Sequence, residues 1–149
     1  MKAVIQRVSW AKVHVNGDVV GRCGPGLLVL IGASRQDNKA IAEKLALKIL
    51  GLRIFDDSQG KINLALSDVL FSDDPQILVV SNFTLYGDVT KSKRPSFTQA
   101  AAYDNGNVLY EHFITCLREH HVKVESGVYG AEMQVELMND GPVTLVVEL

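Results

Sequence analysis

The sequence predicts one domain of mixed α/β class, and three observations support this prediction. Short segments in which apolar and polar residues alternate indicate strands, because side chains along a strand point to opposite faces in turn. Two longer segments with apolar residues at every third or fourth position indicate amphipathic helices. The 149 residues contain no internal repeat, linker or low-complexity tract. We therefore expect residues 1–149 to form a single domain with two main helices.

The first elements expected are a β-hairpin and a buried strand. Apolar and polar positions alternate over residues 11–15, which is typical of a half-buried strand. Asn16-Gly17 follows and favours a type I′ turn, because both central positions of that turn need positive φ. The return strand begins at residues 19–20. Residues 27–31 are all apolar and predict a strand that is covered on both faces.

A helix and a second hairpin come next. Apolar residues recur with helical spacing across residues 38–50, with Asp37 as the expected N-cap and Gly51 at the exit. Residues 52–55 and 61–66 predict two strands around a polar turn.

The second half of the chain predicts a buried strand, a second helix and a final hairpin. Residues 77–80 form another apolar run, and residues 107–119 have helical spacing. Alternation over residues 131–137 and again over 143–149 indicates two strands. The turn residues 139–142 lie between them and predict a hairpin.

The composition indicates which partners the protein can bind and in which cellular compartment it folds. The formal net charge is −2, so any contact with nucleic acid should be small and local. Cys23 and Cys116 belong to no CxxC pair, which fits a reducing cytosol better than a disulfide framework. Charged residues near the N-terminus interrupt the apolar core that a signal peptide would need. No apolar run is long enough to span a membrane. We therefore expect a cytoplasmic protein with no membrane contact.

One candidate metal site lies on the second helix. His112, Cys116 and His120 follow one another at intervals of four residues and share a helix face. Three ligands from one straight helix suit tetrahedral zinc poorly, so a partly buried helix face is the favoured interpretation. None of the histidines has an evident nucleophile beside it in the sequence.

Two neighbouring segments are candidates for binding. Lys91, Lys93 and Arg94 form the densest basic cluster, which is either a solvated loop or a phosphate contact. Polar residues 81–84 follow a buried strand, where α/β proteins often place binding groups. Thr84 is either a nucleophile, with Asp88 as the only nearby base, or part of a strand end whose N–H groups bind a ligand oxygen.

These segments resemble one family over nearly the whole chain, the D-aminoacyl-tRNA deacylases. The segments that carry the resemblance are MKAVIQRVSWAKV, GLLVLIG, LRIFDD, GKINLAL, VVSNFTLYGD, KRPSF, LYEHF and NDGPVTLVVEL. The strongest of them contain SNFT at residues 81–84 and NDGPVT at residues 139–144. Two positions depart from the family pattern: Asn82 stands in place of the usual Gln, and Gly87 in place of the usual Ala.

The resemblance implies a layered or barrel-like sheet and a homodimer whose active sites lie between the subunits. Gly141-Pro142 would carry a cis peptide and reach into the partner's pocket as the chirality selector. Arg7 would lie behind this turn and fix its orientation. The other implied site residues are the wall that receives the ester, at Ser81, Asn82, Phe83 and Thr84, and two residues that hold the terminal adenosine, Tyr129 and Met133.

The implied reaction is hydrolysis of the ester between a D-amino acid and the terminal ribose of tRNA. The neighbouring ribose hydroxyl would activate water, and backbone N–H groups would stabilise the oxyanion, with no metal or organic cofactor. Only the acceptor end of the aminoacyl-tRNA would enter the site, which agrees with the net charge. Glycyl-tRNA mischarged on tRNA-Ala is a further expected substrate. The alternative is a non-catalytic RNA- or DNA-binding module on the same fold.

Overall fold

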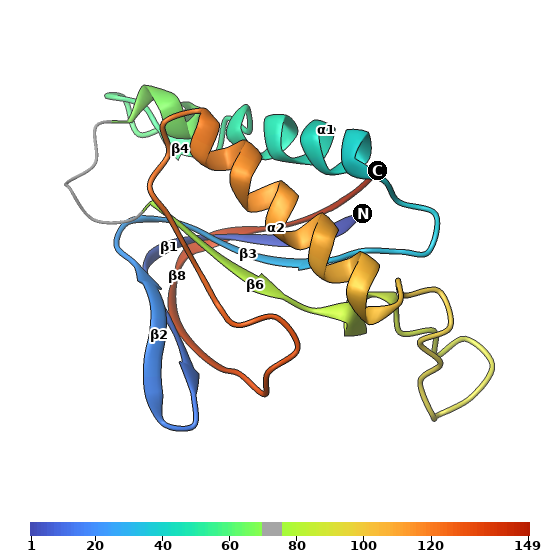
Figure 1. Ribbon diagram of the computed structural model, residues 1–149. Helices are drawn as coiled ribbons and strands as arrows, with labels where there is room; N and C mark the ends of the chain where they lie inside the picture. Colours follow the sequence, from blue (N-terminus) through green and yellow to red (C-terminus); the bar gives the residue numbers. More distant parts are fainter. Residues whose placement is uncertain (70–75) are drawn as a thin grey trace.

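A six-stranded sheet curls into a nearly closed barrel and carries two helices on one face (Figure 1). The computed structural model describes residues 1–69 and 76–149. The strands of the large sheet are β1 (Lys2–Val15), β2 (Asp18–Cys23), β3 (Gly26–Gly32), β6 (Ile77–Ser81), β7 (Val124–Ser126) and β8 (Gln134–Glu148). A small second sheet pairs β4 (Phe55–Asp56) with β5 (Ile62–Leu64). The helices are α1 (Lys39–Leu50) and α2 (Tyr103–Glu119), with short 3₁₀ helices η1 (Leu66–Asp68) and η2 (Phe83–Tyr86).

The long strand β1 organises the sheet. Its first half pairs antiparallel with β3, its second half pairs antiparallel with β2, and β8 runs antiparallel along nearly all of it. At the far side β2 approaches β7, where the Arg22 N–H donates to the Glu125 carboxylate at 2.7 Å. Gly21 allows this approach, since a Cβ there would lie 2.6 Å from the Ser126 carbonyl oxygen. The sheet therefore almost closes on itself.

Strands β3, β6 and β7 are parallel neighbours, which brings their carboxyl ends to one edge of the sheet. Leu27 to Ile31 of β3 align with Ile77 to Ser81 of β6, and β7 pairs with the first half of β6. The residues that follow β3 and β6 therefore lie side by side at this edge, where α/β sheets commonly bind ligands.

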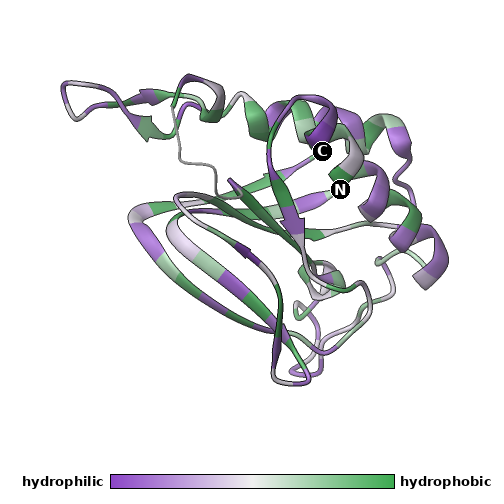
Figure 2. Ribbon diagram, turned by 60° about the vertical axis from the view of Figure 1, so that its left-hand side comes forward, coloured by the Kyte–Doolittle hydropathy of each residue, from purple (hydrophilic) through white to green (hydrophobic). Residues whose placement is uncertain are grey.

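Two apolar clusters fill the interior. The larger lies between the sheet and the helices, where Leu45, Ile49, Phe113 and Leu117 are fully buried. The smaller lies inside the curled part of the sheet and includes Val13 and other strand residues. Figure 2 shows hydrophobic and hydrophilic residues alternating along the long strands, as expected where one face of a strand is buried. Among the described residues, none of the helices is long and apolar enough to cross a membrane.

The structure confirms the mixed α/β class and most of the expected elements. Asn16 and Gly17 both have positive φ, of 53° and 90°, as the predicted turn requires. The strand predicted at residues 11–15 is the end of a longer strand that begins at Lys2. The second helix begins at Tyr103 instead of residue 107. The second hairpin is shorter than predicted, because Leu66 already begins η1.

The predicted N-cap of the first helix is wrong. Asn38 caps α1, and its side-chain oxygen accepts from the Ile41 N–H at 3.1 Å. The Asp37 carboxylate is used elsewhere, because it binds the N-terminal ammonium of Met1 at 2.8 Å and the Ser34 N–H at 2.6 Å. The Met1 ammonium also donates to the Leu149 carbonyl at 2.7 Å, so the two termini lie together.

The predicted final hairpin is also wrong. Residues 134–148 form one strand, β8, and both of its arms pair with β1: Asn139 aligns with Val8, and Thr144 aligns with Gln6. The turn residues between these two positions form a bulge within the strand, not a reversal of the chain. Pairing with one neighbour on both sides of the bulge keeps the chain direction.

Candidate active site

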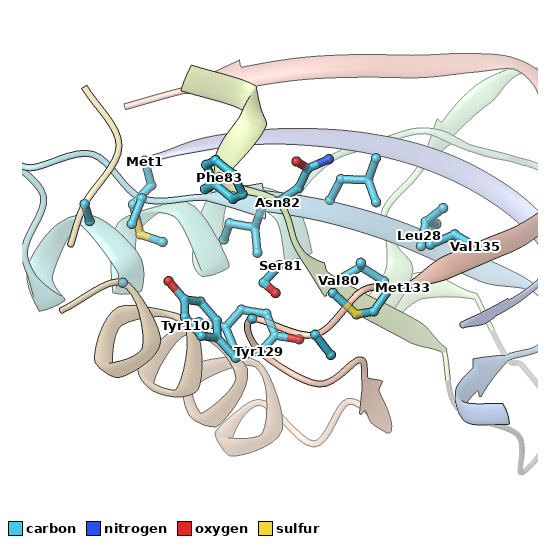
Figure 3. A pocket seen from close by; sticks show the side chains of 18 of the residues that line it. Met1, Leu28, Val80, Ser81, Asn82, Phe83, Tyr110, Tyr129, Met133 and Val135 are labelled. Carbon is cyan, nitrogen blue, oxygen red and sulfur yellow. The ribbon is translucent and has the colours of Figure 1, made fainter. Parts of the chain in front are cut away.

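A cavity of about 570 Å³ lies where β3 and β6 end (Figure 3). Its other walls come from the first turns of α2 and from residues 129–137, which lead into β8 and form its beginning. Among the described residues that line it, no side chain is a carboxylate, an imidazole, an ammonium or a guanidinium. The polar side chains are a few neutral amides and hydroxyls, in an otherwise apolar wall.

The end of β6 places Ser81 and Asn82 in the cavity wall. The Asn82 N–H donates to the Ile31 carbonyl at 2.7 Å, which holds this segment against the neighbouring strand β3. The Asn82 side chain then caps η2, and its oxygen accepts from the Thr84 N–H at 3.1 Å. The Phe83 N–H, at the start of η2, has no hydrogen-bond acceptor among the described residues. In Figure 3 the Ser81 side chain points into the space in front of Tyr110 and Tyr129.

Thr84 does not line the cavity with its three neighbours. Its side chain is exposed, and its hydroxyl donates to the Asn82 side-chain oxygen at 2.5 Å. Asp88 is not its base, because the Asp88 carboxylate accepts from the N–H and the hydroxyl of Thr90, at 2.9 and 2.7 Å. These contacts favour the interpretation of this segment as a strand end with a free N–H over a threonine nucleophile.

A layer of tyrosines forms the opposite wall. The Tyr129 ring packs against Tyr103 and Tyr110, with ring centroids 5.2 and 5.5 Å apart. The Tyr110 hydroxyl donates to the Val79 carbonyl at 2.9 Å, which ties α2 to β6 just before Ser81. Burial raises the pKa of Tyr110 and of Tyr129, so both phenols stay neutral at physiological pH.

Tyr129 and Met133, which the resemblance implies as site residues, lie on this wall together with three residues of α2 that the sequence did not indicate. Tyr103, Gly106 and Tyr110 share one face of the helix and line the cavity. Gly106 leaves room for the Tyr129 hydroxyl, since a Cβ at this position would lie 2.1 Å from that oxygen. A helical pattern extended back to residue 103 would have shown this face.

Gly141 and Pro142 lie in the bulge of β8, and the peptide bond between them is cis. Both residues are exposed, and neither lines the cavity of the same chain. A Cβ on Gly141 would meet only the Asn139 side-chain oxygen, at 3.8 Å. The bulge therefore presents bare backbone to its surroundings.

Arg7 holds this bulge from behind and is only 4% exposed. Its Nε lies 2.9 Å from the Asp140 carboxylate and 3.3 Å from the Asp140 carbonyl oxygen. The Arg7 Nη1 donates to the Ile54 carbonyl at 2.7 Å and lies 3.4 Å from the Asp56 carboxylate. The Asn139 side chain adds a bond to the Arg7 carbonyl at 2.8 Å. The bulge is thus tied to β1 and to the segment around β4.

The metal stripe considered along α2 does not form as a group of three. His112 and Cys116 instead meet Glu43 of α1, and the three potential ligand atoms lie within 4.8 Å of one another. His112 Nε2 is 2.9 Å from the Glu43 carboxylate, the distance of an ordinary ion pair or hydrogen bond. His120 is the exposed C-cap residue of α2 and is not in this group. Burial raises the pKa of the Cys116 thiol, which favours its protonated form.

Comparison with known proteins gives matches over the full length. The chain matches the family described as D-Tyr-tRNA(Tyr) deacylase over residues 4–148. A D-aminoacyl-tRNA deacylase of Thermosipho africanus is 51% identical over 148 residues, which cover 99% of this chain and 97% of the relative. A D-aminoacyl-tRNA deacylase of Carboxydothermus hydrogenoformans is 48% identical over 149 residues, and both chains are covered completely, at 100% each.

Solved structures show the same architecture. The c-Myc DNA Unwinding Element Binding Protein superposes with a TM-score of 0.90 at 38% identity, covering 100% of this chain and 99% of the other. A probable eukaryotic D-amino acid tRNA deacylase superposes with a TM-score of 0.80 at 21% identity, covering 99% and 98%, which is a likeness of fold.

Proposed function

The chain belongs to the D-Tyr-tRNA(Tyr) deacylase family, and we propose that it removes D-amino acids from tRNA at a site shared between two copies of the chain. Membership of this family makes it a hydrolase that acts on aminoacyl-tRNA. The observation that carries the proposal is the cavity at the end of β6, whose polar side chains are neutral amides and hydroxyls beside a free backbone N–H. Such a cavity can bind an activated ester and support its hydrolysis by water, because an activated ester does not need a strong protein nucleophile.

The shared site follows from the position of the β8 bulge. Gly141 and Pro142 are exposed and lie outside the cavity of their own chain, so they act in a cavity only if a second copy supplies it. Strand β8 pairs with β1 along one edge, and the described residues give its other edge no strand partner. It also exposes apolar side chains, with Val146 67% and Met138 53% accessible. We propose a homodimer in which each bulge enters the partner's cavity.

The proposed chemistry uses the substrate's own groups. An ester between an amino acid and ribose is already an activated acyl group, and the 2′-hydroxyl beside it activates the attacking water. The Phe83 N–H then donates to the oxyanion of the tetrahedral intermediate, which stabilises the transition state in a cavity largely free of charge. The tyrosine wall and Met133 contact the terminal adenosine, as rings and a thioether contact a flat base.

The proposed selector works by steric exclusion, and this predicts the substrate range. Gly141 has no side chain, so backbone atoms of the bulge lie against the α-carbon of the bound amino acid and leave one direction open. A D-residue places its side chain in the open direction, whereas an L-residue meets the backbone. Glycine has only hydrogens and cannot be excluded. We expect comparable hydrolysis of D-alanyl-tRNA and glycyl-tRNA, with L-alanyl-tRNA at least about a hundredfold slower.

The measurement is a deacylation time course with the three substrates charged on the same tRNA. Glycyl-tRNA as resistant as L-alanyl-tRNA would contradict steric exclusion as the basis of selection. Equal resistance of all three substrates would contradict the hydrolase function itself.

A second prediction concerns the group that performs the chemistry. Thr84→Ala should keep kcat/KM within about tenfold of wild type, because the Thr84 hydroxyl binds Asn82 and has no base beside it. Thr90→Ala is the matched control, since the Thr90 hydroxyl makes a similar local bond to Asp88. A substrate whose terminal ribose lacks the 2′-hydroxyl should react far more slowly with all three proteins. An acyl group trapped on Thr84 during turnover would overturn this assignment.

A nucleic-acid-binding module remains the second candidate, because one structural relative is named as a DNA unwinding element binding protein. The net charge of −2 argues against contact with a long duplex. Duplex DNA binding at physiological salt, without deacylation of D-aminoacyl-tRNA, would favour this function.

A further inference from the structure

Residues 88–96 form a hairpin beside the cavity, here called the basic hairpin. Two backbone hydrogen bonds between Asp88 and Ser96, of 2.8 and 2.9 Å, close it at its base. Inside the turn the Asp88 carboxylate binds Thr90, and the Arg94 N–H donates to the Ser92 hydroxyl at 3.0 Å. In Figure 1 this segment is the yellow loop that projects from the body of the molecule.

The basic hairpin concentrates positive charge in a chain that is negative overall. Lys91, Lys93 and Arg94 are exposed, and none of them forms an ion pair with another described residue. Asp88 is the only acidic residue of the hairpin. Its pKa is lowered by the hydrogen bonds from Thr90, so it remains ionised and bound within the turn. Three free cations therefore face solvent together, whereas the net charge of the chain is −2.

The base of the basic hairpin is fixed to the rim of the cavity. Phe97 packs edge-on against Phe83, with ring centroids 5.2 Å apart, and Phe83 lines the cavity. Gly87 permits this contact, since a Cβ there would lie 2.9 Å from the Phe97 ring. Beyond Phe97 the chain continues along the rim, where the Ala101 N–H donates to the Ala33 carbonyl at 2.9 Å, and both residues line the cavity. The hairpin that carries the three cations is thus attached at its base to the rim of the cavity.

From the charge and the position of the hairpin, we infer that Lys91, Lys93 and Arg94 bind phosphate groups of the acceptor end of the tRNA whose ester enters the cavity. This inference rests on the proposed function. A polyanion that approaches a chain of net negative charge gains attraction only where cations gather, and each neutralised phosphate releases a bound counterion. Ammonium and guanidinium groups are the usual partners of phosphate oxygens. The alternative is that the hairpin is only a solvated loop, in which case tRNA recognition does not depend on these side chains.

The test compares two substrates that share the ester and differ in phosphate. One is D-alanyl-tRNA, and the other is the D-alanyl ester of adenosine, which has no phosphate. The test protein is Lys91→Gln/Lys93→Gln/Arg94→Gln. The matched control removes three exposed lysines from α1, as Lys39→Gln/Lys44→Gln/Lys48→Gln, and so changes the net charge equally.

We expect the ratio of kcat/KM for tRNA to kcat/KM for the adenosine ester to fall at least about tenfold in the hairpin variant and to remain at the wild-type value in the α1 control. Salt provides the second readout. Each lost phosphate contact reduces the slope of log(kcat/KM) for tRNA against log[KCl] by about 0.7–0.9, so the hairpin variant should be less steep by about 2–3. Raising KCl from about 50 to about 200 mM should thus slow the wild type roughly 20- to 40-fold more than the hairpin variant.

Three outcomes are decisive. A lower ratio together with a smaller salt slope in the hairpin variant alone supports the inference. A wild-type ratio and slope in the hairpin variant, or equal changes in both variants, overturn it while the proposed function stands. A wild-type protein that hydrolyses neither D-alanyl ester overturns the proposed function and the inference together.

Discussion

Gly141→Ala is expected to reduce hydrolysis of D-alanyl-tRNA about a hundredfold or more while leaving the fold intact. The added Cβ meets only the Asn139 side-chain oxygen at 3.8 Å within its own chain, so it should cost little folding stability. In the proposed dimer the same methyl group enters the partner's cavity, where it occupies the space that receives the α-hydrogen of a D-residue. A displacement of the reacting group by about 1 Å is enough for a loss of this size.

Gly51→Ala is the matched control, because Gly51 is also exposed, has a φ of −85°, and its Cβ would make only ordinary contacts from 3.5 Å. Thermal unfolding should give similar midpoints for both variants, and only Gly141→Ala should lose activity. Full activity in folded Gly141→Ala would remove Gly141 from the proposed selector.

The same variant tests whether the site is shared. We expect an inactive Gly141→Ala protein, mixed with an inactive Ser81→Leu protein under conditions of subunit exchange, to regain about a quarter of wild-type activity per chain. Half of the dimers are then mixed, and one of the two sites in each mixed dimer has both an intact bulge and an intact cavity. Light scattering must show a dimer for each variant. Exchange without any recovery of activity would contradict a site built from two chains.

Arg7→Met is expected to impair both stability and activity. Removing the guanidinium leaves the Ile54 carbonyl without its donor and the Asp140 carboxylate without its buried counterion. We expect the free energy of unfolding to fall by about 2–4 kcal/mol, and hydrolysis of D-alanyl-tRNA to fall about a hundredfold as the bulge loses its support. Urea denaturation and initial rates measure the two effects.

Arg7→Lys separates charge from shape. One ammonium cannot reach the Ile54 carbonyl together with the carbonyl and the carboxylate of Asp140, as the planar guanidinium does. The free energy of unfolding and the activity of Arg7→Lys should therefore lie between those of wild type and Arg7→Met. Wild-type stability and activity in Arg7→Met would show that the bulge keeps its position without this contact.

The parts of the fold that depend on local chemistry were predictable from the sequence. The Asn16-Gly17 turn and the helix that ends near Gly51 are determined by neighbouring residues. The errors arose where distant residues decide the structure. Asp37 did not cap α1 because the Met1 ammonium binds its carboxylate, and residues 139–142 did not reverse the chain because both of their flanks pair with β1. Strand β7 was missed because it has only three residues and exists through parallel pairing with β6.

The candidate site was predictable to a similar extent. The resemblance indicated residues 81–84 and Tyr129, and the structure places Ser81, Asn82, Phe83 and Tyr129 around one cavity. It leaves Thr84 outside the cavity, where its hydroxyl donates to the Asn82 side-chain oxygen. Tyr103 was missed because the helix was predicted to begin too late, at residue 107. Tyr110 lies within the predicted helix, but its place in the cavity wall depends on how α2 packs against the sheet.

The bulge in β8 has a kinetic consequence for how errors are rejected. A loop at the free end of a hairpin can fold away and close again around whatever ligand arrives, so an incorrect ligand can reshape it. The bulge is anchored by pairing with β1 on both sides and by Arg7 from behind, so its shape is set before any substrate binds. On the proposed function, the groups that discriminate between D- and L-residues are already ordered in the free protein, so no free energy is spent on ordering them when the substrate binds. An L-aminoacyl ester is then excluded from the cavity at the encounter instead of being held there in a slow complex, so correctly charged tRNA in large excess does not block the cavity.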